Sequence, residues 1–167
     1  MGIEIDFELW YRAEHPKLLA AMAVVAQDVD VARDVTAEAF ARALERWDRV
    51  AEMRSPGGWT YRVALNLLRR RCRRAALERR LLIRMAPSPT SISVPVPAIE
   101  VWEAVTALPP RMRTAVALRY LGGLTEAEVA DAMGVSSGTI AGTLHDARRR
   151  LAVLLGSDSP TQEVTYG

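Results

Sequence analysis

Apolar residues recur at helical spacing in both halves of this 167-residue chain, and neither half alternates apolar and polar residues as a strand would. Near the N-terminus, Phe7, Trp10 and Tyr11 begin a first predicted helix, in which Pro16 is placed to cause a kink or a split. A second helix is predicted over residues 31–47, where small and large apolar residues share one side. The pattern therefore predicts helices throughout.

A third predicted helix runs from Pro56 to about Leu82 and changes character along its length. Ser55 and Pro56 are suited to be its cap and its first residue, and its first turns place Trp59, Val63 and Leu67 toward a core. Its later turns, within residues 69–84, hold eight arginines and one acid. The sequence therefore predicts that the first turns of this helix pack in a hydrophobic core. The arginine-rich turns are then free to bind an anion, of which nucleic acid is the most obvious. A merely solvated helix face is the alternative.

The second half predicts four short helices that end in a helix–turn–helix. An apolar face over residues 99–108 comes first, and a second helix begins at two prolines and ends at Gly122. Thr125 and Glu128 have the spacing of a capping box, Gly134 permits the turn, and Ser136 is suited to cap the last helix. The buried stripe of that last helix is predicted to consist of Ile140, Leu144, Ala147 and Leu151.

A proline-rich segment separates the two halves. Residues 85–98 contain four of the nine prolines together with several hydroxyl residues, so this segment is expected to be an extended linker. The predicted fold is therefore all-α, with two small helical domains at residues 1–84 and 99–156, and a flexible tail at residues 157–167.

Charge and composition narrow the function. The net charge of +2 divides into an excess of four positive charges in residues 1–84 and of two negative charges in residues 85–167. No apolar run is long enough to span a membrane, and the acidic N-terminus is unlike a signal peptide. The single cysteine, Cys72, excludes an internal disulfide. We expect a cytoplasmic protein.

Catalysis is not expected. His15 and His145 are the only histidines and lie far apart in the sequence, and one cysteine cannot provide a Cys/His zinc site. No glycine-rich phosphate loop follows a strand, because no strand is predicted. We therefore expect neither enzyme activity, nor a cofactor, nor a metal.

Three segments, in order, resemble an extracytoplasmic-function (ECF) sigma factor of bacterial RNA polymerase. They are "DVTAEAFARALERWDRV", "SPGGWTYRVALNLLRRRCRR" and "ALPPRMRTAVALRYLGGLTEAEVADAMGVSSGTIAGTLHDARRRL", and the resemblance covers roughly residues 5–155. It implies docking on the polymerase clamp helices by the first segment, recognition and melting of the −10 element by the second, and contact with the −35 element by the third. Core RNA polymerase and promoter DNA are the implied partners, and anti-sigma factors are common partners in that family.

The resemblance assigns candidate residues to each role. The polymerase-binding candidates are Asp34, Glu38, Phe40 and Arg42. The −10 candidates are Trp59, Asn66, Arg69, Arg70, Arg71, Arg73 and Arg74, although for Trp59 packing in the core is favoured over stacking on a base. The −35 candidates are Ser136, Ser137, Thr139, Thr143, His145, Arg148 and Arg149.

The sequence also departs from the family pattern. Members commonly have basic residues where this chain has Ala141, Thr143 and Asp146, an acid at Arg70, and glutamine at Ala37. The −35 contact is therefore expected to be weak, with phosphate held by backbone N–H groups at the start of the last helix and most electrostatic affinity in residues 69–84.

Two alternatives remain open beside a promoter-specificity subunit. A sigma-like regulator or decoy would bind polymerase or a control protein and read little DNA, as the weakly basic recognition helix suggests. A free-standing helix–turn–helix repressor would leave the match in residues 28–74 unexplained.

Overall fold

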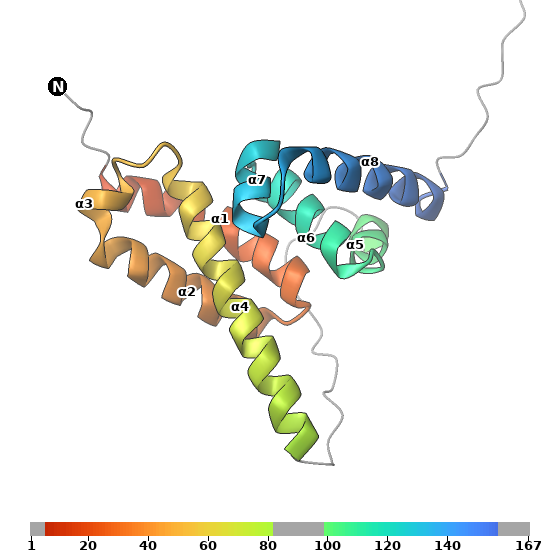
Figure 1. The fold of residues 1–167 in the computed structure, drawn as a ribbon, viewed down its shortest axis with the longest axis horizontal. Helices are drawn as coiled ribbons and strands as arrows, with labels where there is room; N and C mark the ends of the chain where they lie inside the picture. Colours follow the sequence, from red (N-terminus) through yellow and green to blue (C-terminus); the bar gives the residue numbers. More distant parts are fainter. Residues whose placement is uncertain (1–5, 82–98, 157–167) are drawn as a thin grey trace, which may run out of the picture.

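The computed structural model describes residues 6–81 and 99–156, and every regular element in those ranges is helical. The all-α prediction is confirmed, whereas the predicted linker at residues 85–98 and the predicted tail lie outside the described residues. The N-terminal half contains α1 (Phe7–Ala26), α2 (Val29–Glu45), α3 (Trp47–Val50) and α4 (Pro56–Leu81). The C-terminal half contains α5 (Ile99–Thr106), α6 (Pro110–Val116), the π-helical turn η1 (Ala117–Leu121), α7 (Glu126–Met133) and α8 (Ser137–Leu154) (Figure 1).

Side-chain caps set the starts of the helices as the sequence predicts. Ser55 Oγ accepts a hydrogen bond of 3.0 Å from the Gly58 N–H at the start of α4. Thr125 and Glu128 form a complete capping box on α7, and Ser136 caps α8. Between α7 and α8, Gly134 adopts a φ of 71°, a left-handed conformation that glycine adopts without steric cost. Pro16 does not split the first helix, since α1 continues through it.

Aromatic rings hold the outer end of the N-terminal half together. Phe40 of α2 packs edge-on against Tyr11 and Trp10 of α1, with ring centroids 4.9 and 5.3 Å apart. The ring centroid of Trp47, at the start of α3, lies 4.7 Å from that of Trp10. Phe40 is only 3% exposed, so this cluster anchors α2 on α1 and leaves the opposite side of α2 to solvent.

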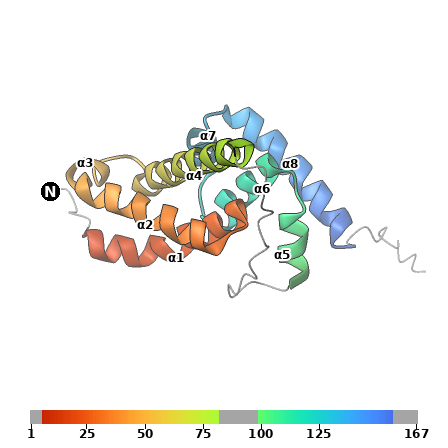
Figure 2. The ribbon, with the colours of Figure 1, turned by 90° about the horizontal axis from the view of Figure 1, so that it is seen from below.

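The two halves share one continuous hydrophobic core. In the view of Figure 2, α1 and α4 run from the N-terminal bundle to the helices of the C-terminal half, where α1 packs against α6 and η1 and α4 packs against α7. Tyr61 of α4, which is 1% exposed, lies directly against Gly122. Because a Cβ on Gly122 would lie 2.9 Å from the Tyr61 ring, only glycine allows this close approach without movement.

The C-terminal half of α4 leaves the core and projects away from both bundles (Figure 1). Leu68 is still buried, but from Arg69 to Arg80 every residue except Ala75 is exposed. The expected division of this helix into a buried end and an exposed, arginine-rich end is confirmed, and binding of an anion by the exposed end stays a prediction.

Candidate nucleic-acid interface

The exposed side of α2 carries three of the four residues expected to bind polymerase. Arg42 donates a hydrogen bond to Glu38 one turn earlier on the same helix. Asp34 instead accepts a hydrogen bond of 2.9 Å from Arg71 Nη1 on α4. The structure therefore joins a polymerase candidate to a DNA candidate by an ion pair, and the two predicted surfaces meet along the seam between α2 and α4.

Phe40, the fourth residue of that group, is a core residue in this structure. Its ring lies among Trp10, Tyr11 and His15 and is almost fully shielded from solvent. It cannot touch a partner while α2 stays packed on α1, so direct contact with polymerase by Phe40 is a wrong prediction for this conformation. Its physical role is to fix the orientation of the exposed residues of α2.

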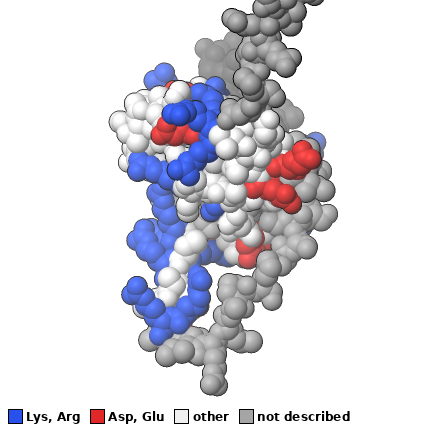
Figure 3. Space-filling model, turned by 90° about the vertical axis from the view of Figure 1, so that its right-hand side faces the viewer, with Lys and Arg blue, Asp and Glu red and all other residues white. Residues whose placement is uncertain are grey.

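The arginines of α4 form a basic surface around the projecting end of the helix. Figure 3 shows Lys and Arg side chains concentrated along that end, with acidic side chains mainly elsewhere on the visible face. Within the described residues, Arg70 and Arg73 have no hydrogen-bond or ion-pair partner, while Arg74 pairs with Glu78 at 3.1 Å. Exposed ion pairs contribute at most about 1 kcal/mol, so all these guanidinium groups are available to phosphates.

Of the two remaining −10 candidates on α4, Trp59 lies where this helix meets α7 and Asn66 lies on its exposed surface. Trp59 is half-buried and lines a cavity of about 420 Å³ together with Arg62 and residues of α7, and it does not join the hydrophobic core. The favoured interpretation of Trp59 as a core residue is therefore wrong. Asn66 is exposed, and its Oδ1 accepts a hydrogen bond of 3.4 Å from Arg69 Nη1.

The −35 candidates occupy the exposed side of α8, opposite the buried Ile140, Leu144 and Ala147. Ser136 Oγ accepts the Thr139 N–H at 3.2 Å, so one of the backbone donors expected to bind phosphate is already used by the cap. The Thr143 hydroxyl donates to the Thr139 carbonyl at 2.8 Å and is likewise engaged within the helix. Ser137 and His145 are exposed and lack such partners among the described residues.

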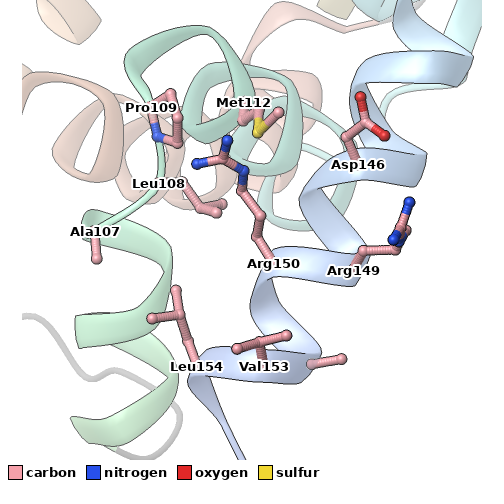
Figure 4. A pocket seen from close by; sticks show the side chains of 10 residues that line it. Ala107, Leu108, Pro109, Met112, Asp146, Arg149, Arg150, Val153 and Leu154 are labelled. Atoms are coloured by element: carbon pink, nitrogen blue, oxygen red, sulfur yellow. The ribbon is translucent and has the colours of Figure 1, made fainter. Parts of the chain in front are cut away.

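The arginines at the end of α8 point in different directions. Figure 4 shows Arg150 reaching from α8 toward Met112 across a pocket between α8 and the segment that joins α5 to α6, whereas Arg149 points away from that segment. Arg148 Nε donates to the Tyr120 hydroxyl at 2.8 Å. Arg149 is therefore freer for DNA than Arg148, which η1 holds in place.

Sequence reasoning missed two polar contacts that shape these surfaces. Ser55 donates a hydrogen bond to Oε1 of Glu128, which links the start of α4 to α7. Burial acts to raise the pKa of Glu128, but hydrogen bonds from Ser55 and Thr125 and the charge of Arg54 together hold that pKa below its usual value. The second missed contact is the hydrogen bond between Arg148 and Tyr120. The one feature of the sequence that could have indicated it is a tyrosine two residues before the glycine that ends a helix.

Metal sites and membrane-spanning helices were also considered for the described residues. Among them, no group of three or more His, Cys, Asp or Glu side chains could hold a metal ion. In the same part of the chain, no helix has both the length and the apolar character that crossing a membrane requires.

Family models and relatives match both halves. Residues 10–78 match the model described as Sigma-70 region 2, and residues 98–151 match Sigma-70, region 4. The RNA polymerase sigma-E factor of Streptomyces coelicolor is 29% identical over 153 residues, which cover 90% of this chain and 86% of that protein. The RNA polymerase sigma-E factor of Streptomyces avermitilis is 28% identical over 152 residues, which cover 90% of this chain and 85% of that protein.

Two solved structures share the fold. The sigma factor RpoE in complex with the anti-sigma factor NepR from Bartonella quintana has a TM-score of 0.73 and 21% identity, covering 92% of this chain and 99% of that one. CnrH in complex with the cytosolic domain of CnrY has a TM-score of 0.58, again at 21% identity, covering 92% and 89%. At this identity the likeness concerns the fold.

Proposed function

This chain belongs to the sigma-70 family, as a factor of the ECF type, and we propose how its surfaces direct core RNA polymerase to promoters. The exposed side of α2, with Asp34, Glu38 and Arg42, docks on the polymerase. The N-terminal half recognises and melts the −10 element through α4, and α8 contacts the −35 element. A sigma-70 region 2 and a sigma-70 region 4 on one chain, each with a surface suited to its role, are the observation that supports this proposal.

In this proposal the arginines of α4 supply most of the affinity for promoter DNA. Its arginines neutralise phosphates of the promoter, and the half-buried Trp59 and the exposed Asn66 lie about two turns apart on the same helix. Stacking of a base on an aromatic ring contributes about 1–3 kcal/mol, so Trp59 is suited to hold an unpaired base.

The −35 contact is the weaker of the two. Over its first three turns, the exposed side of α8 offers hydroxyl groups, glycines and His145, and the first arginine is Arg148. Because residues 137–147 contain no lysine or arginine and one exposed acid, Asp146, binding by this part of the helix depends on shape and on the backbone N–H groups at its start. We propose that α8 sets the position of the complex and that α4 holds it.

The chain acts as a binding subunit, and the chemistry of transcription belongs to the polymerase. We place it in the cytoplasm, where core polymerase and promoter DNA are found. An anti-sigma factor is a further partner that we propose, because the RpoE and CnrH structures, which share this fold, each contain a second protein.

A sigma-like decoy is the second candidate function, favoured by the absence of lysine and arginine from residues 137–147 of α8. Run-off transcription with purified core polymerase on a library of genomic fragments separates the two. A promoter-directing factor gives discrete transcripts that core polymerase alone does not make. A decoy binds core polymerase tightly and yields no such transcript on any fragment.

A further inference from the structure

Tyr120 is a large aromatic residue that the hydrophobic core does not enclose. It lies in η1 and is 53% exposed, whereas Leu118, two residues earlier in the same turn, is fully buried. Burial therefore does not account for a tyrosine at this position. Because a tyrosine hydroxyl both donates and accepts hydrogen bonds, the partners of that hydroxyl indicate what the residue does.

Two arginines surround the Tyr120 ring. Arg148 Nε, on α8, donates to the Tyr120 hydroxyl at 2.8 Å. The guanidinium carbons of Arg119 and Arg148 lie 5.9 and 6.0 Å from the ring centroid, within the range of cation–π attraction. Arg119 is fixed in turn, because its Nη1 donates to the Leu124 carbonyl at 3.0 Å. Tyr120 thus holds the Arg148 guanidinium in one orientation, although both side chains are exposed.

The π-helical turn η1 carries Tyr120 to the side of α8. The Gly122 N–H donates to the Ala117 carbonyl, five residues earlier, at 3.0 Å, and this bond closes the wide turn. A Cβ at Gly122 would lie 2.6 Å from the Leu118 carbonyl oxygen, so a glycine is needed where the turn ends. Single π-helical turns are frequent at functional sites. The backbone therefore departs from the α-helix in the turn that presents Tyr120.

The pair formed by Tyr120 and Arg148 keeps hydrogen-bond donors for a further group. The Tyr120 hydroxyl accepts a bond from Arg148, so its own hydrogen remains to be donated. The terminal nitrogens of Arg148 have no partner among the described residues, and no carboxylate in that part of the chain pairs with them. These donors lie together beside a positive charge, so an anion with several acceptor oxygens satisfies them best. A phosphate of a nucleic-acid backbone is such a group, and Arg and Tyr side chains are usual donors to it.

The pair lies next to the proposed −35 surface. Arg148 follows His145, an exposed −35 candidate, by three residues, so the two side chains are neighbours on α8. Residues 137–147 contain no lysine or arginine, so Arg148 is the first cationic residue of this helix. In helix–turn–helix proteins the recognition helix reads base edges while other elements contact the backbone. A phosphate contact made jointly by η1 and α8 fits that division.

We propose that Tyr120 and Arg148 together bind one phosphate of the DNA backbone beside the −35 element, with the Tyr120 hydroxyl holding the Arg148 guanidinium in place. This inference rests on the proposed function, since it requires α8 at the −35 element. Tyr120 is then a positioning residue and a second donor, in a segment outside the recognition helix. An arginine that is already held loses less side-chain freedom when it binds, so this contact offsets in part the lack of lysine and arginine in the first turns of α8.

Two promoter fragments test the proposal, with the factor bound to core polymerase. One fragment contains the −35 element, and the other ends between the −35 and −10 elements of a promoter mapped by run-off transcription. Tyr120→Phe keeps the ring and removes the hydroxyl, so we expect its affinity for the longer fragment to fall about 2- to 10-fold. Its affinity for the shorter fragment should not change.

Variants of Arg148 test charge and geometry separately. Arg148→Ala should reduce the salt slope of binding to the longer fragment by about 0.9, the contribution of one duplex phosphate contact. Arg148→Lys keeps the charge but lacks the forked geometry in which one N–H binds Tyr120 while others reach the phosphate, so it should restore the slope and leave the affinity reduced. The losses of Tyr120→Phe and Arg148→Ala should overlap in the double variant, whereas those of Tyr120→Phe and the control Arg149→Ala should multiply.

Replacement of single phosphates near the −35 element by neutral methylphosphonates identifies the group that is bound. One replacement should weaken binding by the unmodified factor and have no effect on binding by Arg148→Ala. The proposal is overturned if no position behaves in this way, if Tyr120→Phe binds the longer fragment as well as the unmodified factor does, or if the losses of Tyr120→Phe and Arg148→Ala multiply. If the unmodified factor binds the two fragments equally, the −35 contact of the proposed function fails as well.

Discussion

Replacing Arg69, Arg71 and Arg73 by alanine should flatten the salt dependence of promoter binding. All three side chains are exposed on the projecting part of α4. Arg71 gives up its ion pair with Asp34 to bind DNA, but with side chains 43% and 62% exposed this pair contributes at most about 1 kcal/mol. The pair therefore does not prevent a phosphate contact.

The magnitude follows from counterion release. Each phosphate contact contributes about 0.9 to the slope of log K against log salt on a duplex and about 0.7 on a single strand, so three contacts account for roughly 2–2.7. Between about 50 and 200 mM salt, the unmodified factor should lose about 20- to 40-fold more affinity than the triple variant. Fluorescence anisotropy of a labelled promoter fragment, with the factor bound to core polymerase, measures this slope.

The control removes three positive charges elsewhere. Arg12, Lys17 and Arg46 are exposed and lie outside α4 and α8, so their replacement by alanine changes net charge equally. That control should leave the slope close to the unmodified value. An unchanged slope in the α4 variant, or an equal decrease in the control, would show that α4 is not the DNA contact.

Three further predictions follow from single residues. Phe40→Ala should lower the free energy of unfolding in a urea titration by about 3–5 kcal/mol, because the ring is buried among aromatic neighbours. Glu38→Ala, which removes a half-exposed side chain and its pair with Arg42, should lower it by at most about 1 kcal/mol, and equal losses in the two variants would remove Phe40 from the core. Burial acts to raise the pKa of Glu128, but Ser55, Thr125 and Arg54 lower it overall, so its stabilisation is present above its unfolded pKa and is lost as the pH falls through the lowered one. Glu128→Gln should therefore give a flatter acid limb in thermal unfolding as the pH falls below 4.5, and parallel limbs would contradict this. Ser136→Ala removes the cap of α8, so it should lower the free energy of unfolding by about 1 kcal/mol and weaken the footprint over the −35 element. Ser137→Ala, one residue on, should leave the free energy of unfolding unchanged. A loss of the same size in both variants would show that Ser136 is not the cap.

Local features of the fold could be predicted from the sequence because the residues that determine them are neighbours in the chain. Ser55, Ser136 and the Thr125–Glu128 capping box mark the starts of α4, α8 and α7 where the structure has them. The buried stripe of α8 likewise follows from helical spacing, although Leu151 is only partly buried. Such features depend on a few adjacent hydrogen bonds and on one helix period.

The packing between the halves could not be predicted in the same way. An apolar side of α4 indicates that something covers it, but the partner of Tyr61 is Gly122, about sixty residues later, and no local pattern joins them. For the same reason Trp59 looked like a core residue, whereas α7 leaves it at the wall of a cavity. The assignment of Phe40 to polymerase binding came from the resemblance alone, and the sequence did not show that the rings of α1 pack against it.

Transcript 5′ ends, mapped genome-wide with purified core polymerase in the presence and absence of this chain, test the central claim most directly. The account predicts a set of start sites that appears only when the chain is present, that shares one upstream sequence pattern, and that disappears with the triple arginine variant of α4. A chain that binds core polymerase while the start sites remain those of core polymerase alone would contradict it.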